Sequence, residues 1–160
     1  MKFFLYNFIL ILLLPLIISR LIIRSLKDRD YIKNISNRFG IYENETESNP
    51  VWFHAVSLGE VISSETLIKK ILIDNKVVLS VSTPTGYRQA KKIFGNSLQI
   101  VYAPWDIYFF VNNFLKKFNP KALIIFETEI WPSMIKASSA KKIPIFLTND
   151  QVDRLLETAK

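Results

Sequence analysis

From Val51 onward, short apolar runs alternate with helix-like stretches, and this alternation constrains the fold more than any other feature of the chain. The apolar runs have the length of strands and span residues 51–56, 77–82, 99–102, 122–126 and 143–147. Between them, stretches such as 61–73 carry apolar residues at helical spacing. Strands that alternate with helices form βαβ units. The pattern therefore predicts an α/β fold with a parallel sheet, and it leaves the strand order open.

Polar residues gather at the ends of the predicted strands. The segments "SLGE", "TPTG", "APWD", "ETEIWP" and "TND" each follow one of the apolar runs. The carboxyl ends of parallel strands meet at one edge of a sheet, and open α/β sheets bind their ligands along that edge. We therefore expect these segments to converge on one crevice.

The N-terminal segment is apolar and long. Residues 3–19, "FFLYNFILILLLPLIIS", carry no charge, and a helix over them would be about 26 Å long against a hydrocarbon core of roughly 30 Å. We predict a membrane-anchor helix over residues 1–25, which either spans or only embeds, then a basic and polar connector over 26–50 and the sheet domain over 51–160. A cleaved signal peptide and a buried core helix are the alternatives, although no small-x-small cleavage site follows.

The formal net charge of +7 points to the membrane because of where the charges lie. The basic residues that follow the apolar segment directly are Arg20, Arg24, Lys27, Arg29, Lys33 and Arg38. Such a flank is attracted to an anionic leaflet, and the positive-inside rule puts the rest of the chain on the cytoplasmic side. The basic residues are not grouped on one recognition helix, so we do not expect nucleic acid as a partner. The chain has no cysteine, which excludes disulfides and thiolate metal sites.

Ser57 and Glu60 have two interpretations. They fit the capping box S-x-x-E before an apolar helical run, in which each side chain bonds the backbone of the other. Capping explains Gly59 less well, because glycine in a first helical turn costs up to about 1 kcal/mol unless something approaches the backbone closely. A carboxylate at this edge is also a candidate general base.

The segment "STPTG", residues 82–86, leads from a predicted strand into a helix. The amides at such a helix start would suit an anion. The segment matches neither nucleotide-binding glycine pattern, so an ordinary turn with a threonine cap is an equally good interpretation.

In "FETEIWP", Glu127 and Glu129 end a strand that should be buried on both faces. Carboxylates placed there need partners or a function. Trp131 then precedes a proline that begins a helix. His54 is the only histidine, so a catalytic metal is not expected.

Taken in order and at their intervals, "FHAVSLGE", "STPTG", "YAPWD" and "ETEIWP" closely resemble the amino-terminal half of the Kdo transferases, which add 3-deoxy-D-manno-octulosonic acid (Kdo) to lipid A precursors. The apolar N-terminus and "NRFGIY" at 37–42 are similar as well, so the resemblance extends to Asn149. It implies the Rossmann-like N-terminal domain of a GT-B glycosyltransferase at the cytoplasmic face of the bacterial inner membrane. The implied donor is CMP-Kdo, the implied acceptor is the lipid A precursor lipid IVA, and no cofactor or metal is implied.

The resemblance also implies roles for individual residues. Glu60 matches the general base of the family, and Glu127 matches an acidic residue that stabilises the transition state. The residues implied to lie on the substrate side are Ser57, Gly59, Thr83, Thr85, Gly86, Glu129 and Trp131.

The sequence departs from the family in length and in its tail. The family is more than twice as long, and after Asn149 it has an Asn-Ala-Arg segment where this chain reads "DQVDRLLETAK". On this basis we expect a truncated amino-terminal half without the donor site, inactive alone. A non-catalytic membrane-tethered module that binds lipid A and a decayed remnant are the competing hypotheses.

Overall fold

The computed structural model describes residues 2–43, 49–126 and 131–149. Its centre is a five-stranded, all-parallel sheet in the order β3-β2-β1-β4-β5. The strands are β1 (Val51–His54), β2 (Val77–Val81), β3 (Gln99–Tyr102), β4 (Ala122–Phe126) and β5 (Ile145–Thr148). The predicted α/β fold with a Rossmann-like parallel sheet is thus confirmed.

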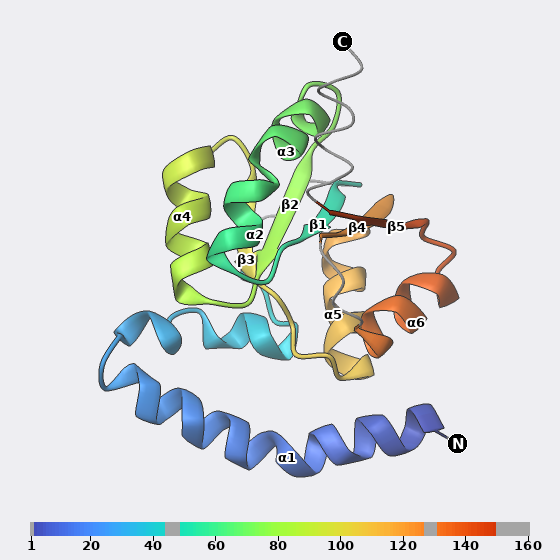
Figure 1. Ribbon diagram of the computed structural model, residues 1–160. Coiled ribbons are helices and arrows are strands. Elements are labelled where there is room, and N and C mark those ends of the chain that lie inside the picture. Colours follow the sequence, from blue (N-terminus) through green and yellow to red (C-terminus); the bar gives the residue numbers. More distant parts are fainter. Residues whose placement is uncertain (1, 44–48, 127–130, 150–160) are drawn as a thin grey trace.

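Helices cover both faces of the sheet (Figure 1). One face carries α2 (Leu58–Ser63), α3 (Glu65–Leu72) and α4 (Pro84–Phe94), and the other carries α5 (Tyr108–Phe118) and α6 (Pro132–Ala140). Side chains alternate along a strand, so Phe53 packs with the first group while its neighbour Trp52 packs with the second. Both are fully buried. Burial on both faces explains why the strands read as continuous apolar runs.

The helix predicted over 61–73 is interrupted. α2 ends at Ser63 and α3 begins at Glu65, with Ser64 between them as the cap of both. Ser64 is fully buried, whereas Ile62, one of the apolar residues in the 61–73 stretch, is 47% exposed. The bend at Ser64 turns Ile62 away from the core that receives Val61 and Ile68.

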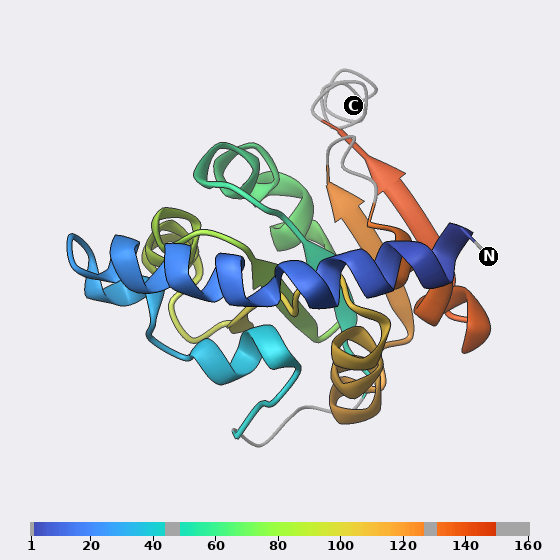
Figure 2. The ribbon, with the colours of Figure 1, turned by 90° about the horizontal axis from the view of Figure 1, so that it is seen from below.

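The apolar N-terminal segment forms one helix, α1 (Lys2–Ser25), which lies across the carboxyl edge of the sheet (Figures 1 and 2). Near its start, the Tyr6 hydroxyl donates to Asp106 (2.8 Å) and the backbone N–H of Tyr108 donates to the Asn7 side-chain oxygen (2.7 Å). At its other end, the Arg24 guanidinium lies over the Tyr31 ring. Ile17, Arg20 and Arg24 also border a cavity whose other wall includes Ser82, Thr83 and Trp105, so α1 runs along one edge of the domain.

By length and composition α1 could cross a membrane, and none of its most apolar window is buried. Its large apolar side chains are exposed, with Phe4 77% and Leu12 69% accessible. A helix of this exposure is not the buried core helix considered from the sequence.

Residues 26–43 pack on the domain through two short 3-10 helices, η1 (Arg29–Tyr31) and η2 (Ile35–Phe39). Tyr42 is buried against Phe114 and Phe118 of α5, and its hydroxyl donates to the carbonyl of Tyr102 (3.0 Å). Part of the segment predicted as a connector thus contributes to the core.

Candidate functional site

The strand order puts a topological switch point beside β1. The chain builds β1, β2 and β3 to one side and then returns to add β4 and β5 on the other, so the topological switch lies between β1 and β4. Helices leave from opposite faces of the sheet at such a point, and ligands bind outside the carboxyl ends of the strands there. The segments that follow β1, β2 and β3 all lie at this edge, as the sequence predicted.

Glu60 is held at the start of α2 by a capping box. The Ser57 oxygen accepts from the backbone N–H of Glu60 (3.4 Å), and the Ser57 hydroxyl donates to Glu60 Oε1 (2.8 Å). Glu60 Oε2 accepts from the backbone N–H of Val56 (2.6 Å), so its carboxylate reaches back past the cap residue. The predicted cap by Ser57 is confirmed, whereas the return bond of Glu60 goes to the Val56 backbone and the Ser57 hydroxyl and not to the Ser57 backbone. The half-buried carboxylate is thus fixed through both oxygens.

The start of α4 lies directly beside the start of α2. Thr83 caps α4, because its side-chain oxygen accepts from the backbone N–H of Gly86 (3.1 Å), and Thr85 donates to the same oxygen (3.3 Å). A Cβ on Gly86 would lie 3.3 Å from the carbonyl carbon of Ser57. Gly86 thus allows the two helix starts to approach, and the threonine-cap interpretation of "STPTG" is correct.

Gly59 has a different environment. A Cβ at this position would meet only the Ser57 hydroxyl, at 3.9 Å, and the residue is exposed. Packing among the described residues therefore does not require glycine here, and the backbone of the first α2 turn is open to an approaching molecule.

His54 is buried at the end of β1. Ser80 Oγ lies 2.8 Å from His54 Nδ1 and also accepts from Trp52 Nε1 (2.8 Å). The Trp131 ring meets the imidazole edge to face, with 5.2 Å between the centroids. Burial lowers the pKa of His54 to about 4, so the ring is neutral at pH 7. Trp131 packs with the cluster on the α5 and α6 face of the sheet, whereas α2, with Glu60, covers the opposite face.

Glu127 and Glu129 fall outside the described residues. In the described part of the chain, no cluster of three or more His, Cys, Asp or Glu side chains is arranged to hold a metal ion.

Two residues without an individual role in the sequence interpretation organise this edge. Asp106 is buried and caps α6, since its carboxylate accepts from the backbone N–H groups of Ser133 (3.0 Å) and Met134 (2.8 Å). Burial raises the pKa of the Asp106 carboxyl, and these bonds oppose the rise. Arg38, from the basic flank, is also buried and donates to the carbonyl of Ser82 (2.9 Å). Asp106 and Arg38 bond residues that lie 27 and 44 positions away in the sequence. No local sequence pattern indicates such a distant partner.

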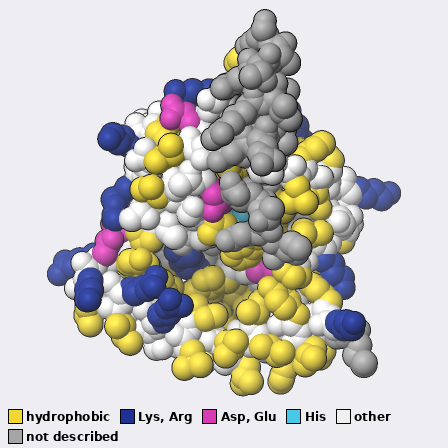
Figure 3. All heavy atoms as spheres, viewed as in Figure 1, with side chains coloured by type: hydrophobic (Ala, Val, Ile, Leu, Met, Phe, Trp, Pro, Cys, Tyr) yellow, Lys and Arg dark blue, Asp and Glu magenta, His cyan; other side chains and the backbone are white. Residues whose placement is uncertain are grey.

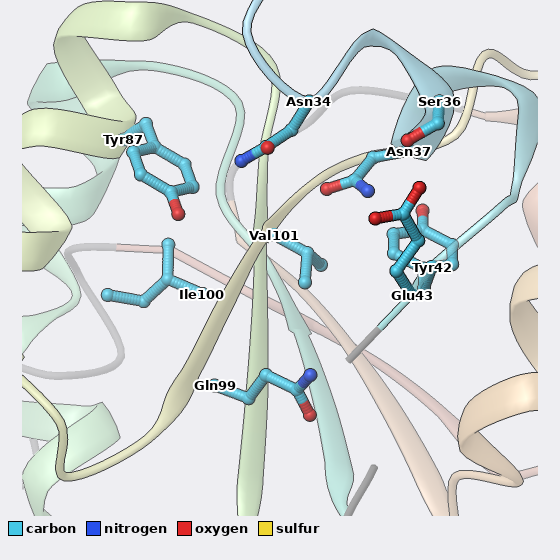
Figure 4. A pocket seen from close by; sticks show the side chains of 9 residues that line it. All are labelled: Asn34, Ser36, Asn37, Tyr42, Glu43, Tyr87, Gln99, Ile100 and Val101. Atoms are coloured by element: carbon cyan, nitrogen blue, oxygen red, sulfur yellow. The ribbon is translucent and has the colours of Figure 1, made fainter. Parts of the chain in front are cut away.

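A separate hollow of about 70 Å³ lies against β3 (Figure 4). Gln99, Ile100 and Val101 line it from the strand, with Asn37 and Tyr42 among the residues opposite. The Asn37 side chain has structural bonds, accepting from the backbone N–H of Tyr102 (3.3 Å) and donating to the carbonyl of Ile41 (3.2 Å). The hollow is on the outer edge strand, with β2 between it and β1, and we assign it no function.

Comparison with known proteins gives a consistent result. Residues 33–154 match the model of the family described as 3-deoxy-D-manno-octulosonic-acid transferase (kdotransferase). The chain is 32% identical over 151 residues to 3-deoxy-D-manno-octulosonic acid transferase of Haemophilus influenzae, covering 91% of this chain and 35% of that protein. The enzyme of the same name from Rickettsia bellii is 28% identical, with 98% and 38% covered. A bifunctional glycosyltransferase/methyltransferase of Fusobacterium nucleatum is 32% identical, with 75% and 19% covered. The chain thus spans between 19% and 38% of the length of these three relatives.

Proposed function

This chain belongs to the 3-deoxy-D-manno-octulosonic acid transferase family, and we propose that it forms the acceptor-binding side of an enzyme that transfers Kdo from CMP-Kdo to a lipid A precursor such as lipid IVA. The main support is the Glu60 carboxylate, fixed beside the topological switch point with an open glycine next to it. In this proposal the donor is held by sequence beyond these 160 residues.

Glu60 is the proposed general base. Its carboxylate takes the proton of the lipid hydroxyl as that oxygen attacks the anomeric carbon of Kdo. Positive charge develops on the sugar in such a transfer, and a second carboxylate nearby favours it. We propose Glu127 for that role, with Glu129 and Trp131 on the substrate side. Gly59 leaves room for the acceptor at the first turn of α2.

The substitution Glu60→Gln separates the two roles of this side chain. A glutamine oxygen still accepts from Val56 N–H, and its amide can donate to the Ser57 oxygen, so the cap is kept while the proton acceptor is lost. With a donor domain supplied, we expect transfer to fall by about 10²-fold or more while the melting temperature stays nearly unchanged. Without that domain we expect no transfer.

The matched control is Glu65→Gln, which removes a carboxylate from the first turn of the next helix, where Glu65 pairs only with Lys69 on the surface. It should leave transfer intact. Retention of most activity by Glu60→Gln would show that Glu60 is a helix cap and not the base.

We further propose that α1 lies in the plane of the inner membrane, at its cytoplasmic face, and does not cross the bilayer. A spanning helix would leave the domain at one end, whereas α1 bonds the domain through Tyr6 and borders a shared cavity as far as Arg24. Its large apolar side chains Phe4, Leu12 and Leu16 are exposed.

The chain has no cysteine, so a single Lys2→Cys substitution reports where the N-terminus lies. In intact spheroplasts, a membrane-impermeant maleimide should not label this cysteine, and it should do so after permeabilisation. Labelling of intact spheroplasts would mean that α1 crosses the membrane.

A further inference from the structure

A cavity of about 190 Å³ separates α1 from the carboxyl edge of the sheet, and its walls are rich in arginine. From α1 it is lined by Ile17, Arg20, Leu21 and Arg24, whose spacing puts them on one side of the helix. From the domain it is lined by Tyr31, Arg38, Ser82, Thr83 and Trp105. Three guanidinium groups thus border a space large enough for a small anionic group.

Arg38 brings a buried positive charge to the wall of this cavity. The side chain is only 5% exposed, and its stacking over the Tyr102 ring holds the guanidinium carbon 4.7 Å from the centroid. One terminal nitrogen donates to the Ser82 carbonyl, but Nε is buried without a hydrogen-bond partner in the part of the chain that the structure describes. A buried charge is costly unless an opposite charge lies near it, and an anion in the cavity would supply that charge.

No carboxylate among the described residues neutralises these arginines. Asp28 and Asp30, the first acidic residues after α1, are both engaged by Arg88 of α4, at 3.0 and 2.6 Å. The Arg24 guanidinium lies over the Tyr31 ring, and Arg20 is exposed on the helix. The cavity therefore concentrates positive charge that no described carboxylate balances.

The position of the cavity indicates the kind of anion. Leu16 (66% exposed) and Ile23 (65%) lie on α1 next to the lining residues and belong to its apolar surface. Figure 3 shows hydrophobic side chains along the lower rim of the molecule, where α1 runs, with Lys and Arg side chains above them. When the apolar surface of α1 enters the bilayer, the opposite side of the helix lies at the depth of the lipid headgroups, where the anions are phosphate esters.

We propose that this cavity binds the phosphate monoester of a lipid headgroup. A monoester carries up to two negative charges and three terminal oxygens, which match guanidinium donors bidentately and balance more of the local charge than a phosphodiester does. The proposal rests on the membrane placement of α1 given above, but it requires neither Kdo transfer nor the donor domain.

The test is flotation of the purified intact chain with phosphatidylcholine vesicles that contain either phosphatidate, a monoester, or phosphatidylglycerol, a diester, matched for surface potential. We expect about ten-fold tighter binding to the phosphatidate vesicles, the scale of one or two additional charge-assisted hydrogen bonds. Equal binding to the two vesicles, or no binding to either, would overturn the proposal.

The double variant Arg20→Gln/Arg24→Gln should abolish the phosphatidate preference. The matched control Lys27→Gln/Arg29→Gln removes the same charge from exposed positions of the same basic flank that do not line the cavity. Each lost cation weakens binding to any anionic vesicle by about five-fold, so both variants bind less, but only the control keeps the preference. A preference that survives in Arg20→Gln/Arg24→Gln would refute the site.

Arg38→Gln, checked for folding by circular dichroism, should lose the preference as well. If Arg38→Gln does not fold, the result for Arg20→Gln/Arg24→Gln decides whether the site exists.

Inorganic phosphate, added at constant ionic strength, distinguishes a lipid headgroup from free phosphate as the source of the anion. We expect weak competition, and complete displacement at millimolar phosphate would assign the cavity to free phosphate and refute the lipid assignment.

Discussion

The Ser80 hydroxyl bonds two other buried side chains, so the stability lost when it is removed can be worked out from the structure. Its hydroxyl lies 2.8 Å from both Trp52 Nε1 and His54 Nδ1, and all three residues are fully buried. Ser80→Ala leaves two buried polar atoms without partners, each worth about 1–3 kcal/mol. His54 Nε2 already has none in the described structure, so its ring would keep no hydrogen bond there. We expect a loss of about 2–6 kcal/mol in the free energy of unfolding.

Ser138→Ala is the matched control because Ser138 is also fully buried, yet its hydroxyl has no partner among the described residues. Removing an unpaired buried hydroxyl should leave stability unchanged or raise it slightly. Urea unfolding of the intact chain in mild detergent, followed by tryptophan fluorescence, measures both variants, and equal m-values would show that the midpoints report stability. Equal losses in Ser80→Ala and Ser138→Ala would refute the hydrogen-bond argument.

Two further predictions concern His54 and the glycines. The folded-state pKa of His54, about 4, lies below its unfolded value of 6.5. Neutral His54 therefore contributes fully to the free energy of unfolding above pH 6.5. This contribution is lost as pH falls towards 4, by about 3 kcal/mol in all. Urea midpoints from pH 7 to 4 should fall less steeply in His54→Gln, and identical slopes would contradict the shift. Gly86→Ala should cost about 1–3 kcal/mol in thermal unfolding, because its Cβ would force α2 and α4 apart, whereas Gly59→Ala should be neutral or slightly stabilising. Equal effects at the two glycines would contradict the packing difference.

The sequence was sufficient to predict the sheet because β1 to β4 are mostly buried and all five strands stand out as apolar runs. Two predicted strands, 99–102 and 122–126, agree with β3 and β4 at both ends. The interruption at Ser64 could not be predicted, since apolar residues continue at helical spacing across it. It is the core beneath α2 and α3 that decides which of these residues are buried.

The site was predictable only where its contacts are local. The capping box joins residues three positions apart, and its spacing identified Ser57 and Glu60. Arg38 contacts Ser82, 44 residues away, and its sequence neighbours suggested only a membrane flank. Similarly, the bond from Tyr6 to Asp106 joins residues 100 positions apart, so the position of α1 over the carboxyl edge follows only from the tertiary structure.

The geometry of Glu60 also bears on whether capping and proton transfer exclude each other. An ionised carboxylate has about four lone-pair sites, and the cap uses one on each oxygen, towards Val56 and Ser57. A substrate hydroxyl can therefore bond a remaining site without breaking the cap. A base held by two hydrogen bonds is restricted in orientation before the acceptor arrives, which lowers the entropic cost of reaching a productive geometry. The Ser57 hydroxyl can also stop donating once Glu60 is protonated, because it still accepts from the Glu60 backbone N–H. We infer that the cap positions the proposed base, and that "SLGE" combines the two functions in one helical turn.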